Sequence, residues 1–161
     1  MYKYETHLHT KEGSACSSAP AADMARAHKA AGYDGIFVTD HFFNANTAVP
    51  RDLPWEDRVD RYFLGYEHAK EVGDEIGLKV WFGCEFTVYN ADFLIYGMEK
   101  DWMKANEELL MHTDERVLFS KLRNELDCFI VHAHPFRHAS YIHHISLYPY
   151  DVDAVETINA S

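Results

Sequence analysis

The chain has 161 residues, 47% of them hydrophobic, and a formal net charge of −11 at pH 7. This length and hydrophobic content predict a single domain with one substantial core. The negative charge argues against tight binding to nucleic acid or to an anionic membrane, because both attract cationic proteins.

Segments typical of strands and of helices alternate along the chain. The alanine-rich residues 20–31 stop at Gly32, as a helix with a glycine C-cap does. In residues 56–76 apolar side chains recur at helical spacing. In chain order we expect a strand over residues 2–9, a helix over 20–31, a strand over 36–38, a loop over 42–55 that is long enough to be a functional lid, a helix over 56–76, strands over 79–88 and 92–97, helices over 102–111 and 115–126, and strands over 128–133 and 154–158.

This alternation predicts an α/β protein with a mostly parallel sheet or barrel. A complete (β/α) barrel usually takes ~250 residues, with ~200 as the lower end. The sequence supplies only five or six strands before residue 161. We therefore expect an incomplete barrel, formed by one domain over residues 1–161 that lacks its C-terminal strands.

The expected strands end in potential metal ligands. His7 and His9 form a His-x-His pair at the end of the first strand, where residues i and i+2 share one face. His41, Glu85 and His134 end three later strands. Chemistry in barrel enzymes sits at the carboxyl ends of the strands. Imidazole with carboxylate suits zinc, iron or manganese, so the sequence predicts a site for divalent ions at this end.

Four ordered motifs resemble those of the PHP (polymerase and histidinol phosphatase) family. They are His7-x-His9, Thr39-Asp40-His41, Gly83-x-Glu85 and His134-Pro135. The resemblance spans nearly the whole chain and implies a distorted (β/α)7 barrel whose two or three divalent ions hydrolyse phosphate esters. It further implies that His7 and His9 bind one ion, that Glu85 bridges two, that His134 binds the second, and that His41 belongs to a third.

The sequence departs from that family at three positions. Many relatives place a histidine five residues before a glycine on the strand after Gly-x-Glu, where this chain has Asp92, itself a possible ligand. Relatives also carry an Asp or His shortly after His-x-His. Here the candidates are Glu12 and, less favourably, Cys16. The family's final Asp-x-His has no counterpart after residue 135, so we expect an incomplete ion cluster and an uncovered edge that favours a homo-oligomer.

Asp40 and His41 are the candidates for catalytic roles, although Asp40 also fits an acceptor that orients a ligating imidazole. Arg137 and Lys11 lie close to motif ends, where they would pair with a substrate phosphate or simply face solvent. His132 would share the face of His134 or be a structural histidine. We expect the remaining histidines to lie on the surface: His28, His68, His112, His138, His143 and His144.

No Gly-x-Ser-x-Gly or C-x(5)-R motif offers a protein nucleophile. A divalent cluster instead lowers the pKa of a bound water and makes hydroxide available near neutral pH. Together with this chemistry, the resemblance to the PHP family implies a metal-dependent, histidinol-phosphatase-like phosphoesterase that hydrolyses a small phosphomonoester by a metal-bound hydroxide. A metal-dependent hydrolase of C–N bonds and a non-catalytic metal-binding domain remain the alternatives. The expected specificity loops, residues 42–55 and 136–149, carry no recognisable code.

Cys16, Cys84 and Cys128 are widely spaced and form no C-x-x-C pair, as is usual in a reducing cytosol. No apolar run approaches the ~20 residues of a membrane span, and Met1 leads into charged residues rather than a signal peptide. We expect a soluble, cytoplasmic protein.

Overall fold

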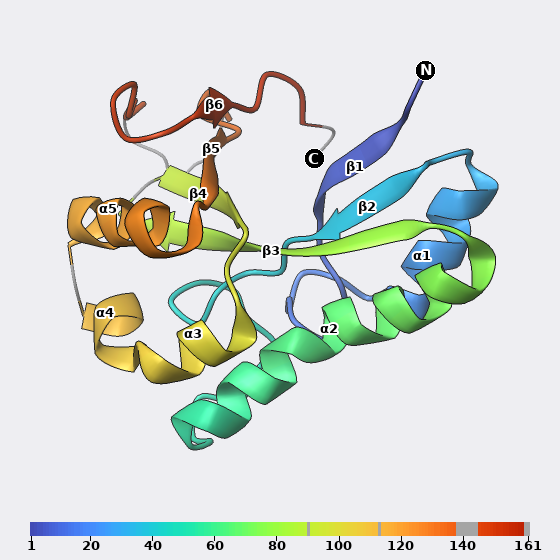
Figure 1. Cartoon of the computed structure of the whole chain (residues 1–161), viewed down its shortest axis with the longest axis horizontal. Coiled ribbons are helices and arrows are strands. Elements are labelled where there is room, and N and C mark those ends of the chain that lie inside the picture. The colour runs from blue at the N-terminus through green and yellow to red at the C-terminus, as the bar shows by residue number, and fades with distance from the viewer. Residues whose placement is uncertain (90, 113, 138–144, 160–161) are drawn as a thin grey trace.

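The computed structural model describes residues 1–89, 91–112, 114–137 and 145–159. These residues form six strands and five helices (Figure 1). They are β1 (Tyr4–Leu8), α1 (Ala21–Ala30), β2 (Gly35–Val38), α2 (Trp55–Ile76), β3 (Lys79–Val88), β4 (Ala91–Tyr96), α3 (Lys100–Ala105), α4 (Glu107–His112), α5 (Glu115–Leu126), β5 (Phe129–Ala133) and β6 (Ala154–Val155).

The six strands form one sheet in chain order, β1-β2-β3-β4-β5-β6. β1, β2 and β3 are parallel, as are β5 and β6, but β4 runs antiparallel to both β3 and β5. The expected mostly parallel sheet is therefore wrong at β4. The reason is the short connection after Val88, because a parallel neighbour would need a crossover of a dozen residues or more. Tyr89 starts this turn with a positive φ of 50°.

The sheet curls, so that both edge strands, β1 and β6, lie on the same side of the molecule (Figure 1). A mixed α/β fold with such a sheet agrees with an incomplete barrel. The predicted seven-fold (β/α) repeat is not seen in the described residues, where β3 passes to β4 without a helix.

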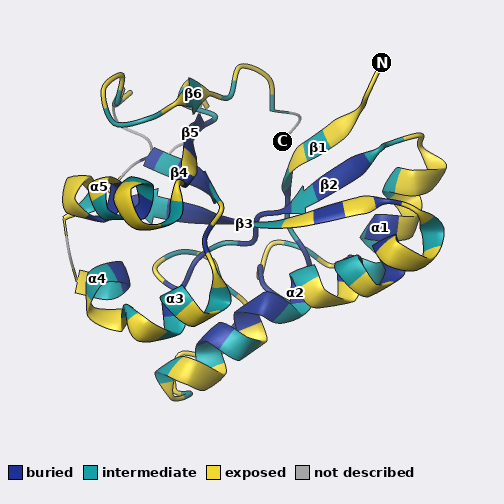
Figure 2. Cartoon of the chain, viewed as in Figure 1, coloured by how far each residue is buried: buried dark blue, intermediate teal, exposed yellow. Residues whose placement is uncertain are grey.

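One half of the core lies between the parallel strands β1–β3 and the helices α1 and α2 (Figure 2). Its side chains are small and aliphatic. Ala21 and Ala25 on α1 and Ala69 on α2 are fully buried, which lets the helices approach Ile36 and Val80 on the sheet closely.

The other half of the core is aromatic and lies under β3–β5, with α3, α4 and α5 around it. Phe42 and Phe43 pack here with Tyr62 of α2, and Phe93 of β4 packs edge-on against Phe119 of α5. The expected lid over residues 42–55 is therefore anchored at its start, because both phenylalanines are buried in the core.

Two expected elements differ in extent. The predicted helix over residues 102–111 is two helices, α3 and α4, which break at Asn106. Its side-chain amide donates to the carbonyl of Trp102 at 2.8 Å, a local bond that competes with the helix ladder. The predicted strand over residues 154–158 pairs only as Ala154–Val155. In the part of the chain that the structure describes, no helix combines the length and hydrophobicity of a membrane span.

Candidate metal centre

A cavity of about 820 Å³ opens where strands of both halves of the sheet converge. Its walls carry imidazoles and carboxylates from the strands and from the residues that follow them: His7, His9, His41, Glu85, Asp92, His134 and Glu156. Leu8 is buried in the core between His7 and His9, so strand alternation turns both imidazoles to the opposite, cavity face.

The carboxylate of Glu85, on β3, is the centre of this arrangement and is only 1% exposed. Its Oε1 lies 3.3 Å from His7 Nε2 and 3.1 Å from His134 Nε2. Its Oε2 lies 3.2 Å from His9 Nε2 and 2.7 Å from His41 Nδ1. The structure thus brings four of the predicted histidines to one buried carboxylate.

Several of these nitrogen and oxygen atoms lie close together without forming hydrogen bonds to one another. His41 Nδ1 and Glu85 Oε2 are close and buried, yet neither has a hydrogen-bond partner of proper geometry among the described residues. His7 Nε2 and His9 Nε2 lie 3.0 Å apart. Buried polar atoms are normally paired, so lone pairs directed at a shared point are best explained by a cation.

The charges of the site push protons toward the histidines. Burial alone would lower the pKa of His7, but Glu156 and Glu85 outweigh burial and raise this pKa from 6.5 to about 9. Burial would raise the pKa of Glu85, but the adjacent imidazoles, first among them His134 and His41, hold it far below its usual range. The carboxylate is therefore ionised, and a bound cation would take the place of protons.

Potential ligand atoms gather in groups whose members all lie within 4.8 Å of one another. One group is His7, His9 and Glu85, and a second is Glu85, Asp92 and His134. Glu85 belongs to both, as expected of a carboxylate that bridges two ions. Two further groups are His9 with Cys16 and His41, and His7 with His134 and Glu156. Imidazole nitrogen and carboxylate oxygen fit zinc, iron or manganese.

Asp40 is placed differently from its expected catalytic role. Its buried carboxylate accepts hydrogen bonds from the Thr10 N–H, the Thr10 hydroxyl and the Ser14 hydroxyl, each at 2.6 Å, and it does not line the cavity. Ser14 in turn accepts the backbone N–H of His41 at 2.9 Å. The geometry points to a structural role, in which Asp40 holds the loop that positions His41.

Glu12, a predicted ligand, lies outside the cluster. Its carboxylate accepts the N–H of Ala21 at the start of α1, at 3.0 and 3.2 Å, and lies 3.1 Å from His68 Nδ1. The helix N-terminus attracts this carboxylate, because the first N–H groups of a helix lack partners. Cys16, the less favoured alternative, lines the cavity instead, with its Sγ 3.4 Å from His9 Nδ1.

The two basic residues predicted to bind a phosphate occupy different environments. Arg137 lines the cavity in the turn after β5, where its N–H donates to the carbonyl of His134. Lys11 is exposed and is not among the lining residues. The expected position at the site therefore holds for Arg137 alone.

His132 is buried and does not line the cavity. Its ring stacks on Phe93 and meets the edge of Tyr148, and burial together with the nearby His134 lowers its pKa. His28 Nδ1 donates to the backbone carbonyl of Met24 within α1, at 2.8 Å. His138, His143 and His144 lie outside the described residues.

The sequence reasoning missed Glu156 and Asn159, which follow β6. Glu156 lies 3.2 Å from His7 Nδ1, and Asn159 Nδ2 lies 3.2 Å from the Glu156 carboxylate. A signal was present, since an acidic residue between apolar Val155 and Ile158 in a predicted strand calls for a partner.

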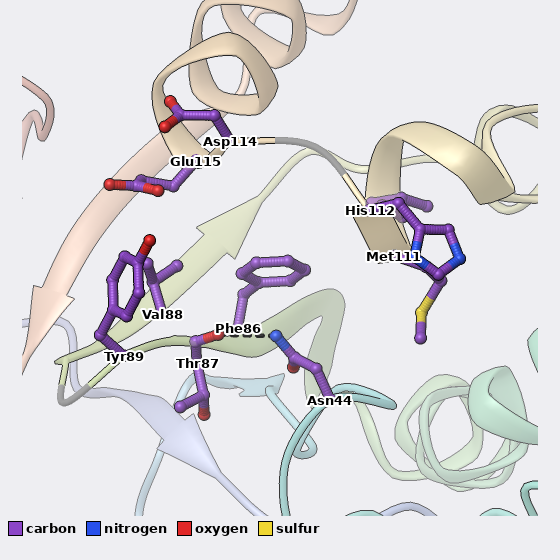
Figure 3. A pocket seen from close by; sticks show the side chains of 10 residues that line it. Asn44, Phe86, Thr87, Val88, Tyr89, Met111, His112, Asp114 and Glu115 are labelled. Carbon is purple, nitrogen blue, oxygen red and sulfur yellow. Dashed lines mark hydrogen bonds between the residues drawn. The ribbon is translucent and has the colours of Figure 1, made fainter.

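A second hollow, of about 410 Å³, lies between the end of β3 and the junction of α4 and α5 (Figure 3). Asn44 Nδ2 donates to the Thr87 carbonyl there at 2.6 Å. His112 stands on a different wall from Asp114 and Glu115, and no potential ligand group of the described residues includes these three. The hollow shows no metal-binding geometry.

Two solved structures share this fold. A two-domain protein from Bacteroides vulgatus, which contains a predicted PHP-like metal-dependent phosphoesterase, aligns with a TM-score of 0.66 and 15% identity over 92% of this chain. A candidate metal-dependent phosphoesterase from Bifidobacterium adolescentis aligns with a TM-score of 0.58 and 12% identity over 96% of this chain. This chain spans 39% of the first protein and 77% of the second.

No protein-family model and no curated protein matches the sequence. At identities this low, the two structures establish a common fold and no more. The four sequence motifs contribute His7, His9, His41, Glu85 and His134 to the walls of the cavity. The fold and the description of the first structure agree with the resemblance to the PHP family.

Proposed function

We propose that the protein is a metal-dependent phosphoesterase that hydrolyses a small phosphomonoester. The observation that carries this proposal is the buried Glu85 carboxylate, which meets four imidazoles in an open cavity. An ionised carboxylate and several imidazoles in one solvent-accessible site are costly to assemble for stability alone, and they are the ligands that zinc, manganese and iron use.

In this proposal the described residues hold two adjacent ions. His7 and His9 would hold the first and His134 and Asp92 the second, and Glu85 would contribute to both. A third position lies beside His41. When bound, such ions supply a water of lowered pKa and neutralise charge on an ester oxygen.

Other residues serve the substrate and the scaffold. Arg137 at the cavity wall supplies a positive charge for the phosphate. Asp40 and Ser14 keep the chain at His41 in place. The cavity has room for a small substrate, since ligand pockets commonly measure ~300–1,000 Å³.

Further proposals concern the complete fold, the substrate, the cellular location and the oligomeric state. We propose that the curled sheet is the larger part of a distorted (β/α)7 barrel and that the enzyme is histidinol-phosphatase-like in acting on a small phosphomonoester. The strongly acidic chain is proposed to act in the cytoplasm, away from nucleic acid and membranes, and to form a homo-oligomer through its uncovered edge.

Hydrolysis of an aryl phosphate by protein loaded with manganese or zinc tests the proposal. His9→Ala should lower the rate at least about 100-fold, because even residues that only orient a ligand are worth ~10–100-fold. His28→Ala is the matched control, since His28 contacts Met24 within α1. Hydrolysis of amides but not of phosphate esters by the loaded protein would overturn the proposal, as would equal losses in both variants.

A further inference from the structure

Glu156 connects the two ends of the curled sheet through one histidine. It follows β6, whereas His7 is the last residue but one of β1, and these two strands lie at opposite ends of the strand order. The carboxylate oxygens of Glu156 lie 3.2 and 3.4 Å from His7 Nδ1. The contact therefore joins segments that no strand pairing holds together.

The two nitrogens of His7 face different groups. Nε2 points into the cluster, 3.3 Å from Glu85 and 3.0 Å from His9 Nε2. Nδ1 lies 3.2 Å from the Glu156 carboxylate and 3.3 Å from Asn159 Nδ2, which itself lies 3.2 Å from that carboxylate. A neutral imidazole carries one proton, and it binds a cation only through the nitrogen that lacks it. The partner of Nδ1 thus decides whether Nε2 is free to bind.

We propose that Glu156 is a positioning residue that accepts the Nδ1–H of His7 and so reserves the Nε2 lone pair for the ion shared with His9 and Glu85. This inference rests on the metal centre of the proposed function but not on its substrate. A hydrogen-bonded carboxylate behind a ligating histidine fixes the ring orientation and makes the imidazole a stronger ligand.

Glu156 is itself held in place for this role. Its Oε2 accepts the backbone N–H of His134 at 2.8 Å and the side-chain amide of Asn159 at 3.2 Å. His134 adopts a positive φ of 27°, which non-glycine residues rarely do. One carboxylate therefore orients a ligand of the first proposed ion and the backbone of a ligand of the second.

His9 offers an internal comparison. Its Nε2 also faces Glu85, but its Nδ1 lies 3.4 Å from the Sγ of Cys16, a much weaker acceptor than a carboxylate. His7 is therefore the imidazole of the pair whose affinity for an ion depends most on the group behind it.

The test is the zinc affinity of full-length variants, measured by competition with a chromophoric chelator. Glu156→Ala should weaken the tightest site about 10–100-fold, and Glu156→Gln, which keeps an acceptor oxygen, should weaken it less. Asp153→Asn is the control for the packing of β6, because Asp153 accepts the Ile130 N–H on β5 at 2.8 Å without contacting the cavity.

A double-mutant cycle assigns the effect to His7. In the His7→Ala background, Glu156→Ala should cost little further affinity, since the group through which it acts is gone. In the zinc-loaded protein the His7 Nδ1–H should give a downfield proton resonance that Glu156→Ala removes and Asp153→Asn preserves.

Three results would overturn the inference: unchanged zinc affinity in Glu156→Ala, equal losses in Glu156→Ala and Asp153→Asn, or full additivity with His7→Ala. Zinc binding that follows the expected pattern without any phosphoesterase activity would overturn only the proposed function. A wild-type protein that binds none of zinc, manganese and iron would overturn both.

Discussion

Asp40, which follows β2, and Glu85, on the neighbouring strand β3, are two buried carboxylates with opposite surroundings. They are 2% and 1% exposed, and the Glu85 N–H donates to the Asp40 carbonyl at 2.9 Å. Asp40 meets neutral donors from Thr10 and Ser14, whereas Glu85 meets four imidazoles. Equal burial therefore does not mean an equal role, and the partners decide it.

The two carboxylates also differ in how closely other atoms pack around them. A Cβ added at Gly13 would lie 2.4 Å from the Asp40 side chain, and one at Gly65 of α2 would lie 2.9 Å from it, so the space around this carboxylate is filled. Glu85 instead faces the large cavity. Burial raises the pKa of Asp40 despite its hydrogen bonds, whereas the imidazoles lower that of Glu85. Of the two carboxylates, Glu85 is the one with room for a cation beside it.

The largest effect should come from Glu85→Gln, which removes the carboxylate shared by both proposed ions. We expect the bound metal per chain, measured by elemental analysis after purification without chelator, to fall to near zero. Zinc affinity should drop by more than the ~10–100-fold typical of groups that only support a ligand. Retention of the full metal content would show that Glu85 is as structural as Asp40.

Asp40→Ala should act in the opposite way, on stability rather than on metal content. The substitution leaves the N–H and hydroxyl donors of Thr10 and the hydroxyl of Ser14 without their acceptor. Each unsatisfied buried group costs roughly 1–3 kcal/mol. Urea unfolding of the metal-free protein should therefore show a loss of about 3 kcal/mol or more. A stable Asp40→Ala protein that cannot bind zinc would place Asp40 among the ligands after all.

The two carboxylates also differ in how far the sequence could predict them. The ligand cluster around Glu85 was predictable, because alternation along a strand fixes which side chains share a face and parallel strands bring their ends together. His7, His9, His41 and His134 meet there as the motifs indicate.

Contacts that depend on the curvature of the sheet were not predictable. Glu156 reaches His7 only because the sheet curls far enough to bring the end of β6 to β1. Likewise, spacing alone could not choose between Glu12 and Cys16. The folding of residues 10–14 around Asp40 turns the former toward α1 and the latter toward His9.

The pH dependence should distinguish the cluster from the Asp40 loop. The pKa of His7 is raised from 6.5 to about 9, so its stabilisation of the metal-free protein is complete below pH 6.5 and is lost as pH rises through 9. The lowered pKa of Glu85 adds stability above its ordinary value of 4.5, which is lost in acid. Thermal unfolding of metal-free protein should therefore show highest stability between about pH 4.5 and 6.5 from these two groups.

Metal binding should show the reverse trend. An ion competes with the proton on His7, so zinc affinity should rise with pH up to about 9, by at most roughly tenfold per pH unit for one released proton. Asp40→Asn should leave this slope unchanged, because its carboxylate lies outside the cavity. A zinc affinity that is independent of pH between 6 and 9 would exclude His7 as a ligand.

The smallest effect should come from Glu12→Ala, which tests a third acidic residue that binds neither ions nor the Asp40 loop. Its carboxylate accepts the Ala21 N–H and pairs with His68, so its loss should cost roughly 1 kcal/mol of unfolding free energy, as for a helix-capping group. His68→Ala is the matched control and should cost less, since exposed ion pairs contribute ~0–1 kcal/mol. Zinc content and affinity should match wild type in both variants, because neither residue lines the cavity. Loss of an ion in Glu12→Ala alone would instead place Glu12 beside the cluster, as its spacing after His9 first indicated.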